Sequence, residues 1–496
     1  MAPDTGNPPR KTAHTPARAP ARAPALSHTK IIATIGPASE DRLGDMIDAG
    51  MSVARINLGH GTEEDFLRRV RKIRKEADKR MRAIGILTDI SGPKLRLARF
   101  EGGKRSLSLG EEVRLRSGSG TSAQGEVLLD FDGFLGAVAP GHRIILADGQ
   151  AELVTEAVDS DSVLARVTRE GEIGDRKGVH FPESRLTHEI PTAQDKKNLA
   201  LAAEAGVDMI GASFVSRPEE VRAIRALIPE ALIIAKIERM AALENLEALL
   251  AEADGVMVAR GDLGVEADIE QLPLIQKTIL AAAVRAGKFG ITATEMLESM
   301  IESSRPTRAE VTDVANAVLD GSDAVMLSAE TAVGAHPIES IATMRKIAIA
   351  VETSQRYNDL PRPEFRISEA NFGNATALAA VQAAEALRVG KIVCFTETGN
   401  SVRLVSRYRP SAEVIGLSPN PRTVNQMTVL AHVRPMLFRR EKSLEEMLYM
   451  ACEMMLVRGM AKTGDTIVFV AGVPPGISRT TNVMKLHRIG EEIKMH

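Results

Sequence analysis

The feature that most constrains this chain is a regular alternation between short apolar runs and longer segments of helical pattern. The runs are rich in β-branched residues and too short for free-standing helices, so they indicate buried strands. Helical segments lie between them, and several end at a glycine, which commonly follows a helix terminus. The strand-like runs are 30–36, 53–58, 83–90, 207–215, 232–238, 255–262, 289–296 and 323–330. Eight such repeats predict an α/β fold built on a (β/α)8 TIM barrel.

Polar side chains gather at the C-terminal ends of these runs, where barrels of this class place their chemistry. One acid at a strand end is commonly a helix cap or a solvated loop residue, but acids and bases on one face of a barrel indicate an active site. Lys236 and Glu238 are two residues apart and so point the same way on a strand. The set is Arg55, Asn57, Asp89, Ser213, Lys236, Glu238, Asp262, Thr294, Ser328 and Glu330.

Two segments fall outside the barrel pattern. Residues 94–190 carry short strand-like stretches separated by glycine and predict an inserted small β-barrel domain, which could act as a lid because it follows a strand's C-terminal end. Residues 357–496 predict a C-terminal open-sheet α/β domain, with helices at 375–387 and 401–407 and strands at 391–396 and 466–472. The catalytic barrel would then comprise 29–93 and 191–356.

Residues 1–28 differ from the rest of the chain. They consist largely of Pro, Ala and Arg with little to bury, which predicts a disordered tail. An organelle-targeting peptide is the alternative, since such peptides are rich in Arg and poor in acids.

The composition restricts the classes of binding partner that we expect for this protein. A formal net charge of −2 gives no global attraction to nucleic acid or to a membrane surface. Aromatic residues make up 3% of the chain and Trp is absent, so a base-stacking platform is not expected. Two cysteines in 496 residues fit a reducing compartment. We therefore expect a cytoplasmic protein with no nucleic-acid or membrane partner.

Several stretches match one family closely. They are KIIATIGPAS (30–39), ARINLGHG (54–61), IIAKIE (233–238), VMVARGDLGVE (256–266) and ATEMLESMIESSRPTRAEVTDVANAVLDGSDAVMLSAETAVGAHPIE (293–339). On these motifs the chain resembles the pyruvate kinases over nearly everything after residue 28. The resemblance implies Mg²⁺- or Mn²⁺-dependent transfer of a phosphoryl group from phosphoenolpyruvate to ADP, giving pyruvate and ATP in the last step of glycolysis. It also implies a homotetramer with a C-terminal regulatory domain.

The resemblance assigns the reacting groups by motif. Glu238 and Asp262 would hold the divalent ion, and two carboxylates with sites left for water and substrate suit Mg²⁺. Lys236 and Arg55 would contact the transferring phosphoryl group and neutralise its charge. Gly261 would let a backbone N–H approach the substrate carboxylate.

The remaining positions complete the predicted site. Thr294 would help deliver a proton to the enolate, through water because a hydroxyl is a weak acid. Ser328 and Glu330 would complete the polar mouth. The positions that match nucleotide contacts are Asn57, His60, Arg96 and Lys177.

The monovalent-ion region departs from the family pattern. Many pyruvate kinases bind K⁺ there, and Asn57 and Asp89 of that set are present. Gly59 occupies the position at which a serine ligand is usual. Lys94 occupies a position at which K⁺-requiring members of the family have Glu. Because a fixed ammonium can replace the charge of the ion, we predict activity without K⁺.

The segment TETGNS predicts a phosphate-binding loop for a phosphorylated effector, since small and hydroxyl residues lie between a strand and a helix start. The residues are Thr396, Thr398, Gly399, Asn400 and Ser401, and 471–482 could add a second wall. The equally weighted alternative is an ordinary helix start capped by Ser401. The sequence does not identify an effector.

Other functions compete with phosphoryl transfer. A metal-dependent barrel aldolase or lyase acting through a pyruvate enolate would use the same acid pair but need no lid, Lys236 or nucleotide. A non-catalytic scaffold should have lost at least one of Lys236, Glu238, Asp262 and Thr294, all of which are present. We also expect His180 and His188 to be surface residues and the basic side chains of 68–75 to belong to a solvated helix.

Overall fold

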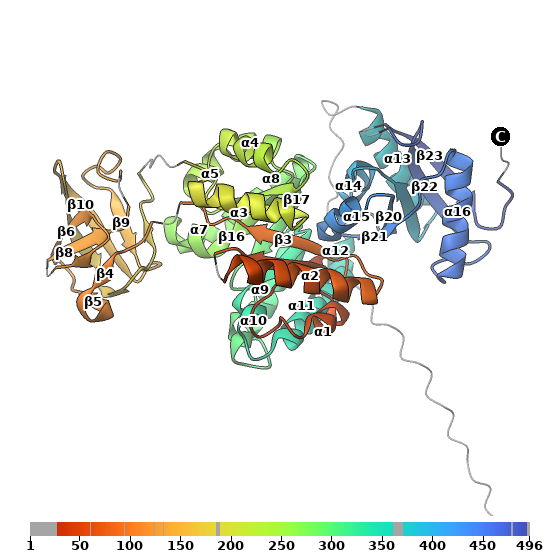
Figure 1. The fold of residues 1–496 in the computed structure, drawn as a ribbon. Coiled ribbons are helices and arrows are strands. Elements are labelled where there is room, and N and C mark those ends of the chain that lie inside the picture. The colour runs from red at the N-terminus through yellow and green to blue at the C-terminus, as the bar shows by residue number, and fades with distance from the viewer. Residues whose placement is uncertain are drawn as a thin grey trace, which may run out of the picture.

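The structure of the protein is a computed structural model (Figure 1). It describes residues 27–59, 61–93, 95–123, 125–131, 133–184, 189–360, 371–477 and 480–493. Nearly all of the predicted tail, together with His60, Lys94 and His188, lies outside the described residues. Figure 1 shows three bodies in a row, with the barrel in the middle.

The predicted barrel is confirmed. Within the described residues, eight parallel strands close on themselves in the order β1-β18-β17-β16-β15-β14-β3-β2. They are almost entirely buried, as expected for strands covered by helices. Their bounds are β1 Lys30–Thr34, β2 Val53–Asn57, β3 Gly85–Asp89, β14 Met209–Ala212, β15 Leu232–Ile237, β16 Gly255–Ala259, β17 Phe289–Ala293 and β18 Ala324–Leu327.

Helices cover the outside of the barrel and pack on it through a large apolar core. Thr62, Thr192 and Thr307 each begin a helix with a reciprocal capping box, which fixes where those helices start. The helices are α1 Leu43–Ala49, α2 Glu63–Lys79, α3 Ala193–Glu204, α4 Pro218–Leu227, α5 Met240–Glu244, α6 Leu246–Glu252, α7 Arg260–Glu266, α8 Leu272–Arg285, α9 Arg308–Leu319, α10 Ala329–Ala332 and α11 Pro337–Glu352. The predicted run 255–262 is shorter as a strand, because α7 begins directly after Ala259 and takes in Asp262.

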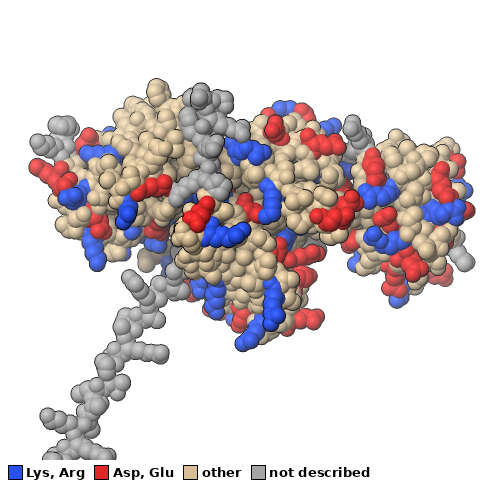
Figure 2. Space-filling model, turned by 180° about the vertical axis from the view of Figure 1, so that it is seen from behind, with Lys and Arg blue, Asp and Glu red and all other residues tan. Residues whose placement is uncertain are grey.

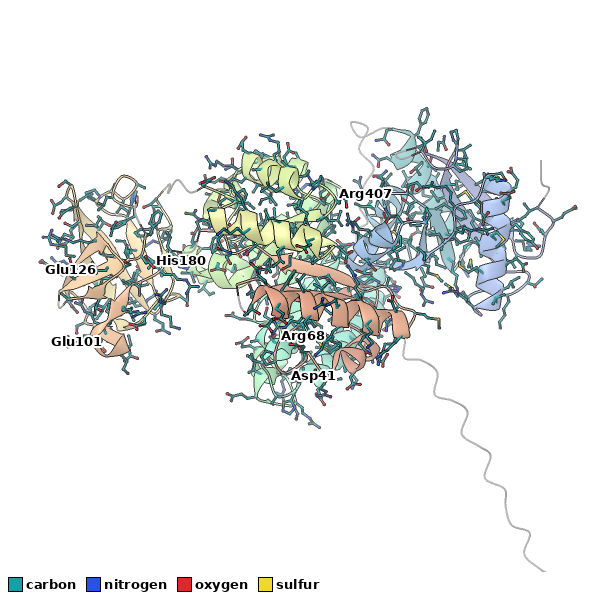
Figure 3. The ribbon with its side chains drawn as sticks, viewed as in Figure 1. Asp41, Arg68, Glu101, Glu126, His180 and Arg407 are labelled. Atoms are coloured by element: carbon teal, nitrogen blue, oxygen red, sulfur yellow. The ribbon has the colours of Figure 1, made fainter. Side chains whose placement is uncertain are left out.

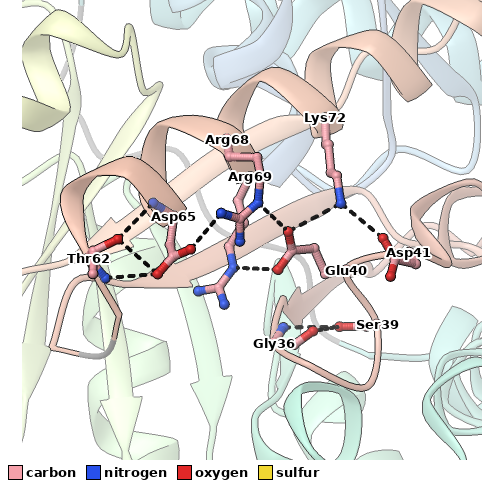
Figure 4. Close-up of polar contacts among 9 residues, drawn as sticks. All are labelled: Gly36, Ser39, Glu40, Asp41, Thr62, Asp65, Arg68, Arg69 and Lys72. Atoms are coloured by element: carbon pink, nitrogen blue, oxygen red, sulfur yellow. Dashed lines mark hydrogen bonds and ion pairs between the residues drawn. The ribbon is translucent and has the colours of Figure 1, made fainter.

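Three basic side chains of α2 pair with one carboxylate, Glu40 (Figure 4). Arg68 and Arg69 place Nε 3.0 and 3.1 Å from the two carboxylate oxygens of Glu40, and Lys72 Nζ lies 3.3 Å from the same side chain. Partial burial acts to raise the pKa of Glu40, but the hydrogen bonds from these three cations lower it to about 2. The charge of these three side chains is therefore balanced largely by Glu40, which precedes α1.

The segment between β3 and α3 forms a separate β body at one end of the molecule (Figure 1). Its described strands make a six-stranded mixed sheet in the order β13-β9-β10-β11-β6-β8 and two two-stranded sheets, β5-β12 and β4-β7, around one apolar core. The bounds are β4 Arg99–Phe100, β5 Lys104–Leu107, β6 Glu112–Ser117, β7 Thr121–Ser122, β8 Glu126–Leu129, β9 Arg143–Leu146, β10 Ala151–Val158, β11 Val163–Arg169, β12 Gly171–Gly174 and β13 Val179–His180. The limits 94–190 stay a prediction.

The C-terminal body is an open sheet in the order β21-β20-β19-β22-β23, in which β23 alone runs antiparallel. The predicted strands and helices are present, but the sequence did not predict β20, β21, β23 or α16. The elements are α12 Gln355–Asn358, α13 Phe372–Ala386, β19 Lys391–Phe395, α14 Asn400–Ser406, β20 Glu413–Ser418, α15 Pro421–Gln426, β21 Val433–Leu437, α16 Leu444–Val457, β22 Thr466–Gly472 and β23 Thr481–Arg488.

The molecular surface is mixed in charge. Figure 2 shows Lys and Arg interspersed with Asp and Glu over all three bodies on the face in view. In the described part of the chain, no helix has the length and apolar character needed to cross a membrane.

Candidate active site

A cavity of about 700 Å³ opens at the C-terminal ends of the barrel strands, on the side that faces the inserted β body. Its walls come from strand exits of the barrel and from residues around β13 of the insertion. Most of the sequence-predicted residues meet here. Those lining it are Arg55, Asn57, Asp89, Arg96, Lys177, Ser213, Lys236, Glu238, Asp262, Thr294 and Ser328.

Lys236, near the end of β15, forms the centre of the cluster. Its Nζ lies 2.6 Å from Glu238 Oε1, 2.8 Å from Ser213 Oγ and 3.7 Å from Asp89 Oδ2. The second oxygen of Glu238 accepts the N–H of Phe214 at 2.7 Å. The side chain of Glu238 is 1% exposed and that of Lys236 is 11% exposed, so both charges are held almost out of water.

Arg55, on the neighbouring side of the barrel, is fixed by Asp89. Its Nε and Nη2 lie 2.8 and 2.5 Å from Asp89 Oδ2, and its Nη1 donates to Thr34 Oγ1 at 3.0 Å. These contacts join the exits of β1, β2 and β3. They hold a guanidinium at the cavity wall in one orientation, which suits it to bind an anion.

The pKa values of Lys236 and Glu238 are set by burial and by the charged groups that lie beside each of them. Burial raises the pKa of Glu238, Lys236 opposes that rise, and the nearby carboxylate of Asp262 adds to it. Burial alone would lower the pKa of Lys236, but the carboxylates of Glu238 and Asp89 outweigh it and leave the pKa above its usual value. Lys236 therefore stays protonated and positively charged, while Glu238 and Asp262 repel each other.

The exit of β17 is tied to the start of α7. Thr294 has a φ of 68°, a strained value for a β-branched residue. Arg260 secures this backbone, since its Nη2 donates to Thr294 O at 2.6 Å and its Nε to Ala293 O at 3.2 Å. The N–H of Gly261 donates to Thr294 Oγ1 at 2.9 Å, so it must exchange this partner before it can bind a substrate carboxylate.

The acid pair fits a divalent cation. Asp262 contributes to the raised pKa of Glu238, and a cation placed between the two carboxylates would relieve their repulsion. Among the described residues no group of three or more His, Cys, Asp or Glu is arranged to enclose a metal. A site with few protein ligands is what Mg²⁺ prefers, because it keeps waters and substrate oxygens in its shell.

The predicted nucleotide positions divide between the two bodies. Asn57 lies at the exit of β2, while Arg96 and Lys177 belong to the segment between β3 and α3. Arg96 Nη1 donates to Arg176 O at 2.7 Å, which anchors it beside Lys177. His60 is outside the described residues.

The predicted monovalent-ion region is described in part. Asn57 Oδ1 accepts the N–H of Gly59 at 2.9 Å, and Asp89 is bound to Arg55. Lys94, on which the prediction of K⁺ independence depends, lies outside the described residues.

The structure places Glu330 away from the cavity that Ser328 lines. Glu330 is fully buried, and its two oxygens accept the N–H groups of Leu297 at 3.1 Å and Ser328 at 2.7 Å. This carboxylate therefore supports the loops after β17 and β18 and does not contact a ligand in the cavity, contrary to the sequence-based expectation.

The sequence analysis missed several residues that line the cavity, among them Asp148, Arg239, Glu266 and His180. His180 was expected at the surface, but it is 8% exposed on β13 and lines the cavity where the inserted body faces the barrel (Figure 3). A Cβ built on Gly178 would meet Asp148 Oδ1 at 2.7 Å and His180 Nε2 at 3.6 Å, so these two side chains lie close together. Burial lowers the pKa of His180. No local signal in the sequence could have shown this, because the insertion supplies the wall.

The predicted effector loop also lines a cavity, of about 50 Å³, in the C-terminal body. Thr396, Thr398, Asn400 and Ser401 contribute to it. The predicted second wall is formed by Gly472, Pro475, Gly476, Ile477, Thr480 and Thr481. Helix α14 begins after Gly399, whose φ is 82°, while Ser401 Oγ lies 2.6 Å from Thr481 Oγ1. The alternative in which Ser401 caps the helix is therefore wrong.

Comparison with known proteins identifies the family. The model of the pyruvate kinase barrel domain matches residues 26–341, and that of the pyruvate kinase alpha/beta domain matches residues 374–487. Pyruvate kinases of Staphylococcus aureus (strain MRSA252) and Staphylococcus epidermidis are each 37% identical over 94% of this chain and 81% of their own length. A crystal structure of a pyruvate kinase from Cryptosporidium parvum superposes with a TM-score of 0.85 at 32% identity, covering 93% of this chain and 96% of that one. The chain belongs to the pyruvate kinase family and is an enzyme of that activity.

Proposed function

We propose that the cavity at the barrel mouth transfers a phosphoryl group from phosphoenolpyruvate to ADP, with Mg²⁺ or Mn²⁺ bound by Glu238 and Asp262. The observation that carries this proposal is the buried Lys236 amine, held between Glu238 and Asp89 at the edge of an acid pair. When bound, the divalent ion held by these two carboxylates would supply positive charge that neutralises the substrate oxygens.

The chain's own residues would hold the reacting groups. Lys236 and Arg55 present fixed positive charge to the phosphoryl oxygens as the bond to the enol oxygen breaks and a bond to the terminal phosphate of ADP forms. Preorganised donors of this kind are worth about 10²–10³ in turnover each, because they need not reorient during the reaction. Asn57, Arg96 and Lys177 would contact the nucleotide, with His60 as the fourth position.

The enolate that remains must gain a proton to become pyruvate. Thr294 lies at the cavity wall with its hydroxyl 2.7 Å from the carbonyl of Ala293, to which it donates. A hydroxyl is too weak an acid to supply the proton alone, so we propose that it orients a water that does. Ser328 completes this wall.

One assay separates this proposal from its rivals. Pyruvate should form from phosphoenolpyruvate only when ADP and Mg²⁺ are both present. An aldolase or lyase would not need ADP, and a scaffold would form no pyruvate under any condition. ADP-independent pyruvate formation would refute phosphoryl transfer.

We further propose that the enzyme works without K⁺, since Gly59 and Lys94 stand where K⁺-binding members have Ser and Glu. The assay is run in buffer free of Na⁺ and K⁺ and repeated after K⁺ is added. Equal rates support the proposal, and strong stimulation by K⁺ would refute it.

The remaining proposals concern regulation and context. The cavity formed by Thr396, Thr398, Asn400 and Ser401 would bind the phosphate of an effector. The family resemblance supports a homotetramer that acts in the cytoplasm as the last enzyme of glycolysis. Titration of phosphorylated metabolites against the substrate-saturation curve tests the first point, and light scattering tests the second.

A further inference from the structure

Two side chains that line the active-site cavity take no part in the reaction as proposed above. His180 lies on β13 of the inserted body, and Arg239 follows β15 of the barrel and directly precedes α5. Both belong to the lining of the same cavity, which opens between these two bodies. They therefore reach the space above the barrel mouth from opposite walls.

His180 has hydrogen-bonding capacity that the protein leaves unused. The residue is 8% exposed, and among the described residues its imidazole makes no hydrogen bond or ion pair. Each ring nitrogen of an imidazole can donate or accept a hydrogen bond, and buried polar groups nearly always have a partner. Figure 3 shows His180 on the side of the inserted body that faces the barrel. The cavity is therefore where this side chain would find its partner.

A glycine keeps the space beside this imidazole open. The backbone is fixed there, because the N–H of Ala147 donates to Gly178 O at 2.9 Å and His180 pairs with Ile145 of β9. A Cβ on Gly178 would lie 2.7 Å from Asp148 Oδ1 and 3.6 Å from His180 Nε2. The absence of a side chain at this position leaves room for a ligand atom beside Nε2. Asp148 is exposed, so solvent screens its repulsion of an anion at this place.

Arg239 is fixed through one nitrogen, and its other donors are free. Its Nε lies 3.3 Å from Glu266 Oε1, while the second oxygen of Glu266 accepts the N–H of Met240 at 3.0 Å. Among the described residues the two terminal nitrogens of Arg239 make no hydrogen bond, and its side chain is 15% exposed. The fork of an arginine matches the oxygens of a phosphate. Arg239 is therefore a fixed cation with donors available for an anion.

The charges of both walls act on His180. Burial lowers its pKa, Asp148 opposes this fall, Arg239 adds to it, and Glu238 opposes it again. Because Arg239 and Glu238 belong to the barrel, the imidazole must lie toward the exit of β15. With its pKa lowered, His180 is uncharged near neutral pH and keeps one N–H to donate. A neutral donor can share an anion with a neighbouring arginine without repelling that arginine.

The two substrates of the proposed reaction differ in what they would bring to this place. The phosphoryl group of phosphoenolpyruvate is assigned above to Lys236 and Arg55 on the barrel. ADP carries a diphosphate, and two of its proposed contacts, Arg96 and Lys177, come from the same body as His180. A diphosphate bound along that wall has a phosphate to place toward the barrel mouth, where it must meet the phosphoryl group.

We propose that His180 and Arg239 bind phosphate oxygens of ADP from the two walls of the cavity and thereby orient the diphosphate for transfer. His180 donates one hydrogen bond, and Arg239 donates through its terminal nitrogens. This assignment rests on the proposed function, because it concerns the nucleotide of that reaction. It adds two residues to the nucleotide positions that the sequence motifs indicated.

The test compares the KM for ADP with the KM for phosphoenolpyruvate in the full-length enzyme at saturating Mg²⁺. His180→Leu keeps an apolar side chain at this position and removes the donor. It should raise the KM for ADP about tenfold, the size expected for one hydrogen bond to a charged group, and leave the KM for phosphoenolpyruvate within about twofold. His180→Gln keeps an N–H donor and should recover most of the loss.

The second variant is Arg239→Gln, made together with Glu266→Gln so that no buried carboxylate is left without its cation. It should also raise the KM for ADP about tenfold, whereas Glu266→Gln alone leaves Arg239 in place and should not raise it. The ratio of kcat/KM for ADP to that for GDP should not change in either variant, because both nucleotides carry the same diphosphate. Thermal unfolding shows whether each variant is folded.

Two matched controls come from outside the cavity. His142→Leu removes another histidine of the inserted body, whose Nδ1 lies 3.1 Å from Ser184 Oγ. Arg217→Gln removes an arginine that also precedes a barrel helix and pairs with a glutamate, Glu220. Both controls should keep each KM within about twofold of that of the parent enzyme.

The outcomes separate this assignment from the proposed function. Pyruvate formation by the parent enzyme that depends on ADP supports the proposed function by itself, and its absence would overturn both proposals. Where that dependence is present, an unchanged KM for ADP in His180→Leu would overturn the assignment alone. A rise confined to phosphoenolpyruvate would overturn it in favour of the other substrate, and a changed preference between ADP and GDP in favour of the base. A glutamine variant as weak as the leucine variant would overturn it by showing that packing, and not the donor, matters.

Discussion

Two charge clusters in the barrel are built from the same residue types and differ in burial. At the mouth, Lys236 sits 2.6 Å from Glu238 with both side chains almost excluded from water. On the flank, Glu40 accepts from Arg68 and Lys72, whose side chains are 43% and 39% exposed (Figure 4). The pKa of Glu40 falls to about 2, whereas burial and Asp262 raise that of Glu238.

The difference shows what each cluster can do. Three cations pair with Glu40, so its charge is already neutralised and its role is to support the fold. The buried acid is not fully compensated by one lysine, and its neighbour is another carboxylate. A further cation beside Glu238 would therefore be stabilised. A phosphoryl-transfer site needs carboxylates in this state to bind its divalent ion.

The largest effect should come from removing the buried cation. Lys236→Met should lower turnover by about 10³-fold or more, because a preorganised charge at the phosphoryl group is lost. Steady-state kinetics with saturating phosphoenolpyruvate, ADP and Mg²⁺ measures this. Lys72→Met is the control from the surface cluster and should stay within about twofold of the parent.

A structural loss must be separated from a catalytic one. Removing Lys236 leaves Glu238 buried without its cation, which costs about 3–5 kcal/mol in comparable pairs, while Asp89 keeps its ion pair with Arg55. Adding Glu238→Gln should recover part of the thermal stability but none of the activity. If the double variant recovered activity as well, Lys236 would be a folding residue only.

The next effect concerns the acid pair. Glu238→Gln keeps the shape of the side chain but removes its charge, and should raise the Mg²⁺ concentration needed for half-maximal activity by about tenfold or more. Activity is titrated with Mg²⁺ at fixed substrate. Glu40→Gln, the matching change on the surface, should leave that titration curve in place. An unchanged curve for Glu238→Gln would remove this residue from the metal site.

A smaller effect is expected at Gly261 in α7. A Cβ there meets only the Thr294 side chain at 3.9 Å, so Gly261→Ala should fold normally. It should still raise the KM for phosphoenolpyruvate severalfold, because the methyl group occupies the approach to the N–H. Gly264→Ala on the same helix is the control, since its Cβ meets the end of Leu272 at 3.3 Å, away from the cavity. Equal KM values would show that glycine is not needed for ligand approach.

The barrel was predictable because its strands are buried on both faces and therefore read as unbroken apolar runs. Strand ends were less certain, since Asp262 continues a strand in sequence but belongs to α7. β21 was missed because Pro435 interrupts its pattern, which is tolerated only because β21 is an edge strand.

The active site could likewise be predicted from the sequence only in part. Local sequence brought Lys236, Glu238 and Asp262 to one cavity, since neighbouring strands end at one face of the barrel. It could not show that Glu330 turns inward to two backbone N–H groups. Nor could it place His180, which reaches the cavity from another body. Both depend on how distant segments pack, and local patterns do not record this.

The smallest expected effect is the pH dependence of the stability that Glu40 and its three cations contribute. The pKa of Glu40 is about 2 in the folded protein, below its ordinary 4.5, so its ion pairs stabilise the fold above pH 4.5 and are lost as pH falls toward 2. Glu40→Gln should therefore be less stable than the parent at pH 7, by about 1 kcal/mol or less for each exposed pair removed. The difference in thermal midpoint should shrink as pH falls from 5 to 3. Glu64→Gln on α2, whose side chain makes no ion pair within the described residues, should show no such trend. A Glu40→Gln difference that stayed constant down to pH 3 would mean that the three cations do not hold the charge of Glu40, and the contrast with Glu238 would then rest on burial alone.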